Sequence, residues 1–318
     1  MDIRVYAGTV GWGVWGSDDF GETWQRAFRG VYAECRIWSM SSHAEEPDVV
    51  WAGSDRGVLR QGPDGHAEVV PSPADDMCIW AFAQSPKDPK VLIIGTHPGA
   101  LFRSDDGGGH WRELPVQLVE ECLIGRPRIT RIRFDPFDDD TIWASAEIDA
   151  VHRSSDGGET WERLENGFDF PDIHDIAIVN DNGARKCLAA TARGLYKSTD
   201  EGANWHFQAL DSPWQYTRGM QPRADLDGTV FLCNGDGPPG SQGTLWRSPD
   251  WGETWNDAHL PPTNSTPWMV ATNEADPNVL FVCTNLGQMY RSEDGGECWA
   301  KLPREFGEIR TMLWHSVN

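Results

Sequence analysis

The sequence predicts an all-β protein, folded as a single seven-bladed β-propeller domain over residues 1–318. Three observations predict this fold: a short motif that recurs along the chain, a constant order of strands around each copy, and two chain ends that complete one another. No helical period is sustained over about 12 residues anywhere in the sequence. The chain is therefore expected to consist of short antiparallel strands joined by turns.

The recurring motif is Ser-x-Asp-x-Gly-x-x-Trp. Its six clear copies begin at Ser17, Ser104, Ser154, Ser198, Ser248 and Ser292, at intervals that match one four-stranded blade. A degenerate seventh copy, Gln61-Gly-Pro-Asp64-Gly, fills the long gap between the first two. The Ser hydroxyl and Asp carboxylate can accept hydrogen bonds from the backbone of a tight turn. Gly supplies a positive φ, and Trp can pack between neighbouring sheets, so the motif indicates a structural turn.

The order of elements around the motif is constant. An inner strand such as Ile79–Phe82 comes first, and then a Pro- and Asp-rich turn leads to a β-branched second strand such as Val91–Ile94. A loop then leads into a third strand, which the motif turns into the fourth. This pattern places inner strands near Arg36, Ile79, Thr130, His174, Arg218, Trp268 and Arg310.

The two chain ends predict how the ring closes. Residues 3–27 supply only a second, third and fourth strand, and the C-terminal segment Ile309–Trp314 supplies the missing inner strand. Closure of this kind joins the two ends in one blade and leaves no free sheet edge.

The motif resembles the Asp-box, or BNR, repeat of sialidases, xyloglucan-type endoglucanases, sortilin-like receptors and a photosystem II assembly factor. The resemblance covers essentially the whole chain and implies the propeller fold. It implies no single activity, because those families share the turn and little else. The chain also departs from two of them. It lacks the Phe/Tyr-Arg-Ile-Pro segment of sialidases, and it has one propeller where the endoglucanases pair two.

Composition excludes several classes of partner and favours one compartment. The chain has 49 acidic and 27 basic residues. Its net charge of −22 argues against nucleic acid and anionic membranes as partners. The N-terminus reads as a strand, and no apolar run approaches the roughly 18 residues that span a bilayer. Seven widely spaced Cys without a CxxC fit a reducing compartment. We therefore expect a cytoplasmic protein.

The two faces of the predicted propeller differ. The motif turns and the first-to-second-strand turns share one face, and the second-to-third-strand loops and the links between blades share the other. Four links on that second face are longer than turns require: residues 114–127, 164–173, 208–216 and 258–267. By analogy with other propellers, we expect the ligand there, over the central channel.

Candidate catalytic residues come from three consecutive blades on this face. His97, Glu147, Asp149 and His174 place two imidazoles and two carboxylates near one edge of the channel. Such groups can run acid–base chemistry or hold a divalent ion such as Zn²⁺. Oxygen ligands from several blades would instead suit Ca²⁺, and those at comparable positions are Glu34, Asp55, Asn234, Asp236 and Asn285. The alternative is a solvated polar rim.

Candidate binding residues lie on or beside the inner strands. Trp38, Trp80 and Trp268 could form an aromatic collar for a sugar or aryl group, or could simply pack between blades. Arg36, Arg131, Arg218 and Arg310 could clamp a carboxylate or phosphate, or could pair with neighbouring Glu and Asp. His152 aligns with aromatic residues of other third strands, so a packed ring is expected there.

These residues favour a small-molecule hydrolase at the channel mouth, of the ester, lactone, phosphotriester or glycoside class, with a divalent cation as its candidate cofactor. Two alternatives stay open. One is a non-catalytic propeller that binds a protein or glycan, because no recognised catalytic motif is present. The other is a sialidase-like glycosidase, for which Tyr216 beside Arg218 is the local hint.

Overall fold

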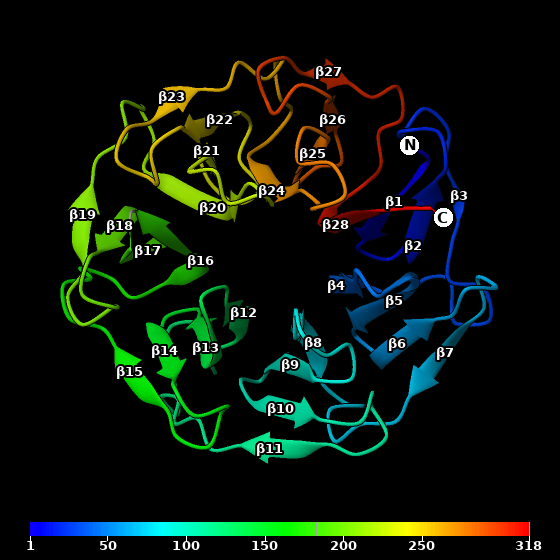
Figure 1. Cartoon of the computed structure of the whole chain (residues 1–318), viewed down its shortest axis with the longest axis horizontal. Helices are drawn as coiled ribbons and strands as arrows, with labels where there is room; N and C mark the ends of the chain where they lie inside the picture. The colour runs from blue at the N-terminus through cyan, green and yellow to red at the C-terminus, as the bar shows by residue number, and fades with distance from the viewer. Residues whose placement is uncertain (182, 318) are drawn as a thin grey trace.

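The computed structural model is a ring of seven four-stranded antiparallel sheets (Figure 1). It describes residues 1–181 and 183–317. The chain is therefore a seven-bladed β-propeller, as the sequence predicts. Within these residues, no helix is long and apolar enough to cross a membrane.

Each blade runs from an inner strand at the channel to an outer strand at the rim. The blade that joins the chain ends consists of β28 (Ile309–Ser316), β1 (Ile3–Thr9), β2 (Val14–Ser17) and β3 (Gln25–Arg26). In chain order, the next two blades are β4 (Ile37–His43), β5 (Glu46–Ser54), β6 (Gly57–Gln61) and β7 (Ala67–Val70), then β8 (Cys78–Gln84), β9 (Leu92–His97), β10 (Leu101–Ser104) and β11 (Arg112–Leu114). They are followed by β12 (Ile129–Asp135), β13 (Asp138–Ala146), β14 (Val151–Ser154) and β15 (Glu162–Leu164), then β16 (Ile173–Asp181), β17 (Ala184–Thr191), β18 (Gly194–Ser198) and β19 (His206–Gln208). The last two are β20 (Tyr216–Pro222), β21 (Val230–Gly235), β22 (Gly243–Ser248) and β23 (Asn256–Asp257), then β24 (Pro267–Ala271), β25 (Leu280–Thr284), β26 (Met289–Ser292) and β27 (Ala300–Lys301).

The ring closes through the chain ends. β28 pairs with β1 over its whole length, and the N and C labels lie on the same blade (Figure 1). Apolar side chains of this pair are buried on both faces of the sheet, with Val5 and Trp314 in one core cluster and Tyr6 in the next. The predicted one-plus-three closure is confirmed.

The repeated motif forms the same turn six times. In the copy after β14, Ser154 Oγ accepts a hydrogen bond from Gly158 N at 2.8 Å and donates one to Asp156 Oδ1 at 2.7 Å. Asp156 Oδ1 also accepts from Thr160 N at 2.9 Å, and Gly158 has φ +95°. The degenerate copy differs, because the Gln61 side chain bonds Phe28 N and the Tyr6 hydroxyl and so joins two blades.

A β-bulge interrupts every inner strand near its start. The pairing with the second strand skips one residue in six strands, and in β20 it skips two. A bulge turns the skipped side chain out of the regular alternation of the sheet. The skipped residues that face the channel, called here the bulge ring, are Trp38, Trp80, Thr130, His174, Arg218, Trp268 and Arg310.

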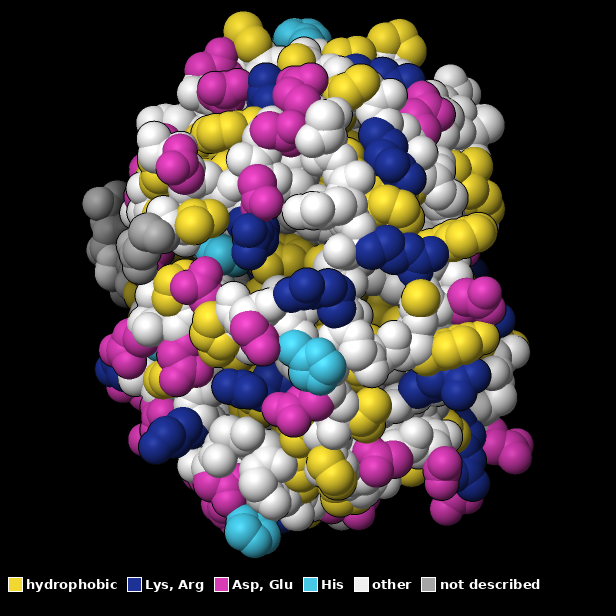
Figure 2. Space-filling view, turned by 90° about the vertical axis from the view of Figure 1, so that its right-hand side faces the viewer, with side chains coloured by type: hydrophobic (Ala, Val, Ile, Leu, Met, Phe, Trp, Pro, Cys, Tyr) yellow, Lys and Arg dark blue, Asp and Glu magenta, His cyan; other side chains and the backbone are white. Residues whose placement is uncertain are grey.

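The outer surface of the ring mixes charges of both signs. In the edge-on view of Figure 2, Lys and Arg lie next to Asp and Glu, with small apolar areas between them. Some of these pairs bridge neighbouring blades: Arg153 contacts both Glu162 of its own blade and, at 3.0 Å, Glu201 of the next. Surface pairs of this kind add little stability each.

Candidate functional site

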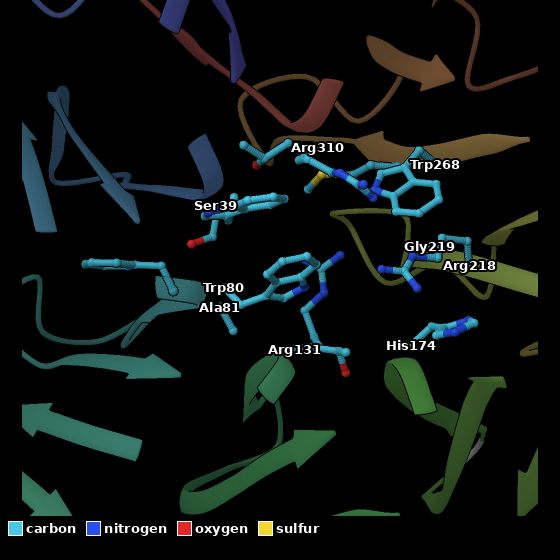
Figure 3. Close-up of a pocket in the computed structure, with 14 residues that line it drawn as sticks. Ser39, Trp80, Ala81, Arg131, His174, Arg218, Gly219, Trp268 and Arg310 are labelled. Atoms are coloured by element: carbon cyan, nitrogen blue, oxygen red, sulfur yellow. The ribbon is translucent and has the colours of Figure 1, made fainter. Parts of the chain in front are cut away.

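The bulge ring surrounds the centre of the channel and receives one residue from each blade (Figure 3). All seven members line the same cavity, because each bulge sits at the start of an inner strand, next to the face that carries the blade links. The space open to water-sized molecules there is only about 40 Å³. That is room for roughly three waters, enough for a carboxylate or phosphate group but not for a sugar ring.

Aromatic rings and guanidinium groups form one wall of this cavity. Trp38 and Trp80 are stacked with ring centroids 4.2 Å apart, so they pack between blades, and both also line the channel. Their role in binding a sugar or aryl group stays a prediction. Arg218 lies over Trp268 at 4.1 Å, and Arg310 lies over Trp268 at 4.5 Å and also near the Trp38 and Trp80 rings. Cation–π contacts of this kind hold a guanidinium by its flat face.

The cationic side chains of the channel differ in how they are neutralised. Arg131 and Arg133 both bond the buried Asp175, at distances of 2.9 to 3.1 Å. Arg310 pairs with Glu308; burial lowers the pKa of Arg310 to about 10, so it remains charged at neutral pH. Within the described residues, Arg218 forms no ion pair.

A cluster of three titratable residues lies beside Arg218. The ligand atoms of Glu147, Asp172 and His174 lie within 4.8 Å of one another. His174 Nδ1 is 2.6 Å from the carbonyl oxygen of Thr217, and its Nε2 is 3.6 Å from Asp172 Oδ1. Burial, with Arg218 adding to it, lowers the pKa of His174 well below its ordinary value, so the imidazole is neutral at pH 7. Burial also raises the pKa of Asp172.

The loop between β13 and β14 positions Glu147. Its backbone N–H bonds the carbonyl of Arg128 at 2.9 Å, and its carboxylate pairs with the Arg128 guanidinium. The next residue, Ile148, has φ +61°, a conformation that β-branched residues rarely adopt. The tight loop thus holds Glu147 against the start of β16.

Two of the four predicted catalytic residues, Glu147 and His174, are brought together by the fold. Their third partner, Asp172, was missed by the sequence interpretation, although the link 164–173 was singled out. The spacing of the two residues carried no signal, because Asp172 lies in the link before β16 and the bulge takes His174 out of the regular alternation.

The other two lie elsewhere. Asp149 is fully buried, and its carboxylate accepts hydrogen bonds from Arg163 Nε at 2.8 Å and Val119 N at 3.0 Å. Its expected place at the channel edge is wrong, because it anchors the link from β11 to β12. His97 ends β9, is half-buried near Arg128 and is not part of the cluster; burial lowers its pKa. His152 is a buried ring bonded to the Asp149 carbonyl, as expected.

The five predicted oxygen ligands for Ca²⁺ do not converge, because most of them have local structural roles. Asp55 caps the Arg36 backbone N–H at 2.9 Å, and Asp236 accepts from Ser241 N at 2.8 Å. Asn234 is fully buried and bonds several groups through both side-chain atoms. Glu34 accepts from the Tyr32 hydroxyl, and Asn285 is buried where its backbone joins Thr266 to Ile309.

Two predicted substrate-binding residues are also placed differently. Arg36 is exposed and does not line the channel, because the bulge of β4 begins two residues later. Tyr216 packs against His174 with ring centroids 5.0 Å apart, and its hydroxyl has no hydrogen-bond partner within the described residues. Burial raises the pKa of Tyr216, against the opposing effect of Arg218. Among the described residues no carboxylate is hydrogen-bonded to this hydroxyl, and a sialidase-like site stays a prediction.

Comparison with known proteins gives two kinds of relative. The family model of the photosystem II assembly factor YCF48 matches residues 75–229. A xyloglucanase from a Paenibacillus species is 27% identical over 317 residues, which cover 81% of this chain and 30% of the relative. The GH74 enzyme of Niastella koreensis superimposes with a TM-score of 0.66 at 17% identity, over 83% of this chain and 45% of that one.

A structure of YCF48 bound to D1 peptide superimposes with a TM-score of 0.58 at 15% identity, and it covers 87% of this chain and 83% of that one. The chain spans less than half the length of the xyloglucanase and GH74 chains above. At identities of 17% and 15%, the similarity to these two solved structures shows a shared fold and nothing further. The repeated turn, the seven closed blades and the family model that matches residues 75–229 together support a β-propeller of the BNR type.

Proposed function

We propose that this chain is a binding propeller that holds a carboxylate group of a peptide at the mouth of its channel. The observation that carries this proposal is Arg218, a guanidinium stacked on Trp268 at 4.1 Å with no ion pair among the described residues. In a chain of net charge −22 with 49 acidic residues, an unpaired cation in a narrow cavity is available for a ligand.

The geometry of Arg218 suits a carboxylate. Its flat face rests on the indole of Trp268 and no carboxylate of the described residues pairs with it, so its N–H groups can form two parallel hydrogen bonds with one carboxylate of a ligand. Arg310 lies over the same indole at 4.5 Å and adds a second positive charge. Because the cavity offers only about 40 Å³ to water-sized molecules, it selects a small planar anion over a larger group.

The rim of the same face suits a peptide around that anion. Several of the large apolar side chains that are exposed lie in second-to-third-strand loops or blade links of this face: Trp12, Tyr32, Leu123, Ile124 and Leu286. Apolar side chains grouped around a polar pocket are typical of protein-binding surfaces. A structural neighbour, YCF48, is described as bound to D1 peptide, which supports a peptide as the ligand class.

Hydrolysis stays a prediction. The xyloglucanase relatives make a glycoside hydrolase the enzyme class to test, and Glu147 and Asp172 are the carboxylates clustered with His174, which lines the channel cavity. Release of reducing sugar from xyloglucan that is lost in both Glu147→Gln and Asp172→Asn would replace the binding proposal with that activity.

The test is calorimetric titration of the protein with octapeptides that end in a free carboxylate, each compared with its C-terminally amidated counterpart. We expect the free acids to bind and Arg218→Ala to weaken them about 10- to 100-fold, because a charge-assisted bond contributes about 1.5–3 kcal/mol. The matched control is Arg60→Ala, which removes an Arg stacked on Trp51 at 5.7 Å that does not line the cavity. Equal affinity for amidated peptides, or unchanged affinity in Arg218→Ala, would sink the proposal.

A further inference from the structure

The cluster beside the channel has the composition and spacing of a metal site. We propose that Glu147, Asp172 and His174 bind one divalent transition-metal ion of the Zn²⁺ class. The three residues come from the loop between β13 and β14, the link before β16 and the start of β16, and their ligand atoms lie within 4.8 Å of one another. The site is additional to the carboxylate clamp of Arg218 and does not depend on it.

His174 is oriented as a metal-binding histidine is. It is 94% buried, and its Nδ1–H donates to the carbonyl oxygen of Thr217 at 2.6 Å. A bond from one ring nitrogen to a backbone carbonyl fixes the tautomer and leaves the lone pair on the other nitrogen. In His174 that nitrogen is Nε2, which points toward Asp172 and forms no hydrogen bond within the described residues.

Asp172 supplies the second, independent observation. The residue is only 9% exposed, and its Oδ1 is a buried oxygen without a hydrogen-bond partner in the part of the chain that the structure describes. Buried polar atoms are almost always paired, so this oxygen needs an explanation. It lies 3.6 Å from His174 Nε2, and a cation or a proton between two acceptors at that distance removes the repulsion of their lone pairs.

The distance between these two atoms fits an ion. Zinc binds His nitrogen and carboxylate oxygen at about 2.0–2.2 Å, so two ligands of a tetrahedral site lie about 3.4 Å apart. The observed 3.6 Å needs an adjustment of only a few tenths of an ångström. Glu147 supplies the third ligand from the carboxylate oxygen that does not face Arg128 Nε. A nitrogen ligand with two carboxylates suits Zn²⁺, Mn²⁺ or Co²⁺ better than Ca²⁺.

Two neighbouring cations set the expected strength of the site. Arg128 pairs with Glu147, and Arg218 lies within electrostatic reach of Asp172 and His174. Their charges oppose a divalent ion, and the two carboxylates offset them. We therefore expect micromolar affinity, well below that of structural zinc sites with several thiolate ligands. Three protein ligands leave a four-coordinate ion one position for water or for the anion of a ligand.

The experiment is a zinc titration of the untagged, metal-free protein in competition with a chromophoric chelator. Cys298 is exchanged for serine in all variants, because it is the exposed thiol. We expect one Zn²⁺ per chain, weakened at least about tenfold in Asp172→Asn and in His174→Asn. Asn at position 174 keeps a donor for the Thr217 carbonyl and lacks only Nε2. His97→Asn, on the same face but outside the cluster, is the matched control and should bind zinc normally.

A second measurement distinguishes loss of the metal site from unfolding of a variant. Co²⁺ bound to a site of one nitrogen and two oxygen ligands gives visible absorption bands, which should be absent in Asp172→Asn and in Glu147→Gln while circular dichroism stays unchanged. Absence of saturable zinc binding up to the millimolar range would overturn the proposal. So would stoichiometric binding that none of the cluster variants weakens, because the ion would then lie elsewhere and the Asp172–His174 contact would hold a proton.

Discussion

Asp175 is the residue on which the guanidinium groups of Arg131 and Arg133 converge. It is 1% exposed, and it accepts hydrogen bonds from Arg131, from Arg133 and from the backbone N–H of Met220. Arg131 and Arg133 keep the pKa of Asp175 below its ordinary value although burial alone would raise it. One carboxylate thus holds β12, β16 and β20 together.

Replacing Asp175 is therefore expected to be severe. Asp175→Asn keeps the shape but leaves the largely buried Arg133 beside a neutral amide, and removing one partner of a buried ion pair costs about 3–5 kcal/mol. Urea unfolding followed by tryptophan fluorescence measures this loss. Asp76→Asn, at an exposed carboxylate, should change the free energy of unfolding by less than about 0.5 kcal/mol. Equal stabilities of the two variants would show that the Arg cluster does not depend on this charge.

For single residues, the sequence predicted position better than role. It identified many of the residues that meet at the channel, but it did not identify what each of them does there. Arg131 and Arg218 are both Arg on inner strands, and the sequence assigned them one role with one alternative. The structure separates them, because Asp175 lies opposite the first and an indole lies under the second. Partners more than 40 residues away in sequence decide such roles, and no local pattern encodes them.

The element whose behaviour is most readable from sequence is the motif turn. The sequence predicted a structural role for its Ser, Asp and Gly. In all six clear copies the Gly N–H donates a hydrogen bond to the Ser hydroxyl, at 2.8 to 2.9 Å. Hydrogen bonds from the side chain and backbone of the residue before the Trp, together with one from the motif Ser, lower the pKa of the motif carboxylates to about 2 for Asp106, Asp156 and Asp200. A turn of this kind is encoded locally, because all its donors and acceptors lie within a few residues.

These turns predict a dependence of stability on acid. An unfolded Asp titrates near 3.8 and the folded ones near 2. A carboxylate with a lowered folded pKa stabilises the protein fully above its unfolded pKa, and the contribution disappears as pH falls through the folded value. The melting temperature should therefore decrease as the pH is lowered from about 4 to about 2. Ser154→Ala, which removes one motif bond to Asp156, should make that fall shallower; a midpoint independent of pH in this window would contradict the account.

The inner-strand bulges are the element that the sequence did not reveal. The regular alternation of apolar and polar residues correctly predicted the strands of all seven blades. By itself, however, this alternation would direct about half of the bulge-ring side chains toward neighbouring sheets and away from the channel. Each bulge depends on close approach to the neighbouring blade. Near the bulge of β20, for instance, a Cβ at Gly219 would lie 2.3 Å from the Trp268 carbonyl oxygen. This packing requirement comes from a different blade, so it appears only in the folded ring.

For the whole molecule, closure decides stability. β28 completes the blade of β1 and buries Ile309, Met312 and Trp314 in its core. Without β28, β1 would present an open edge, and the ring would lose the contact that joins its first and last blades. The chain ends lie side by side, since Val317 N bonds the Asp2 carbonyl at 2.9 Å.

This proximity predicts that connectivity matters less than closure. A circular permutant with the old ends joined by a short linker and new ends opened between Leu123 and Ile124, in an exposed link, should unfold cooperatively near the parent temperature. Deletion of residues 309–318 should abolish that cooperative transition. Differential scanning calorimetry compares the two, and a truncated chain that melts like the parent would refute the role of closure.

The sequence by itself determined the fold, the number of blades, the strand order and the way the ring closes, because these follow from local turns, alternation and the spacing of the repeat. It also identified most of the residues of the bulge ring. Tertiary structure alone decided which charges are neutralised, that Asp172 joins Glu147 and His174, and that Asp149 does not. Those outcomes depend on distances between blades, which are set by bulges and packing across the ring, and such distances carry no signature in any single segment of the chain.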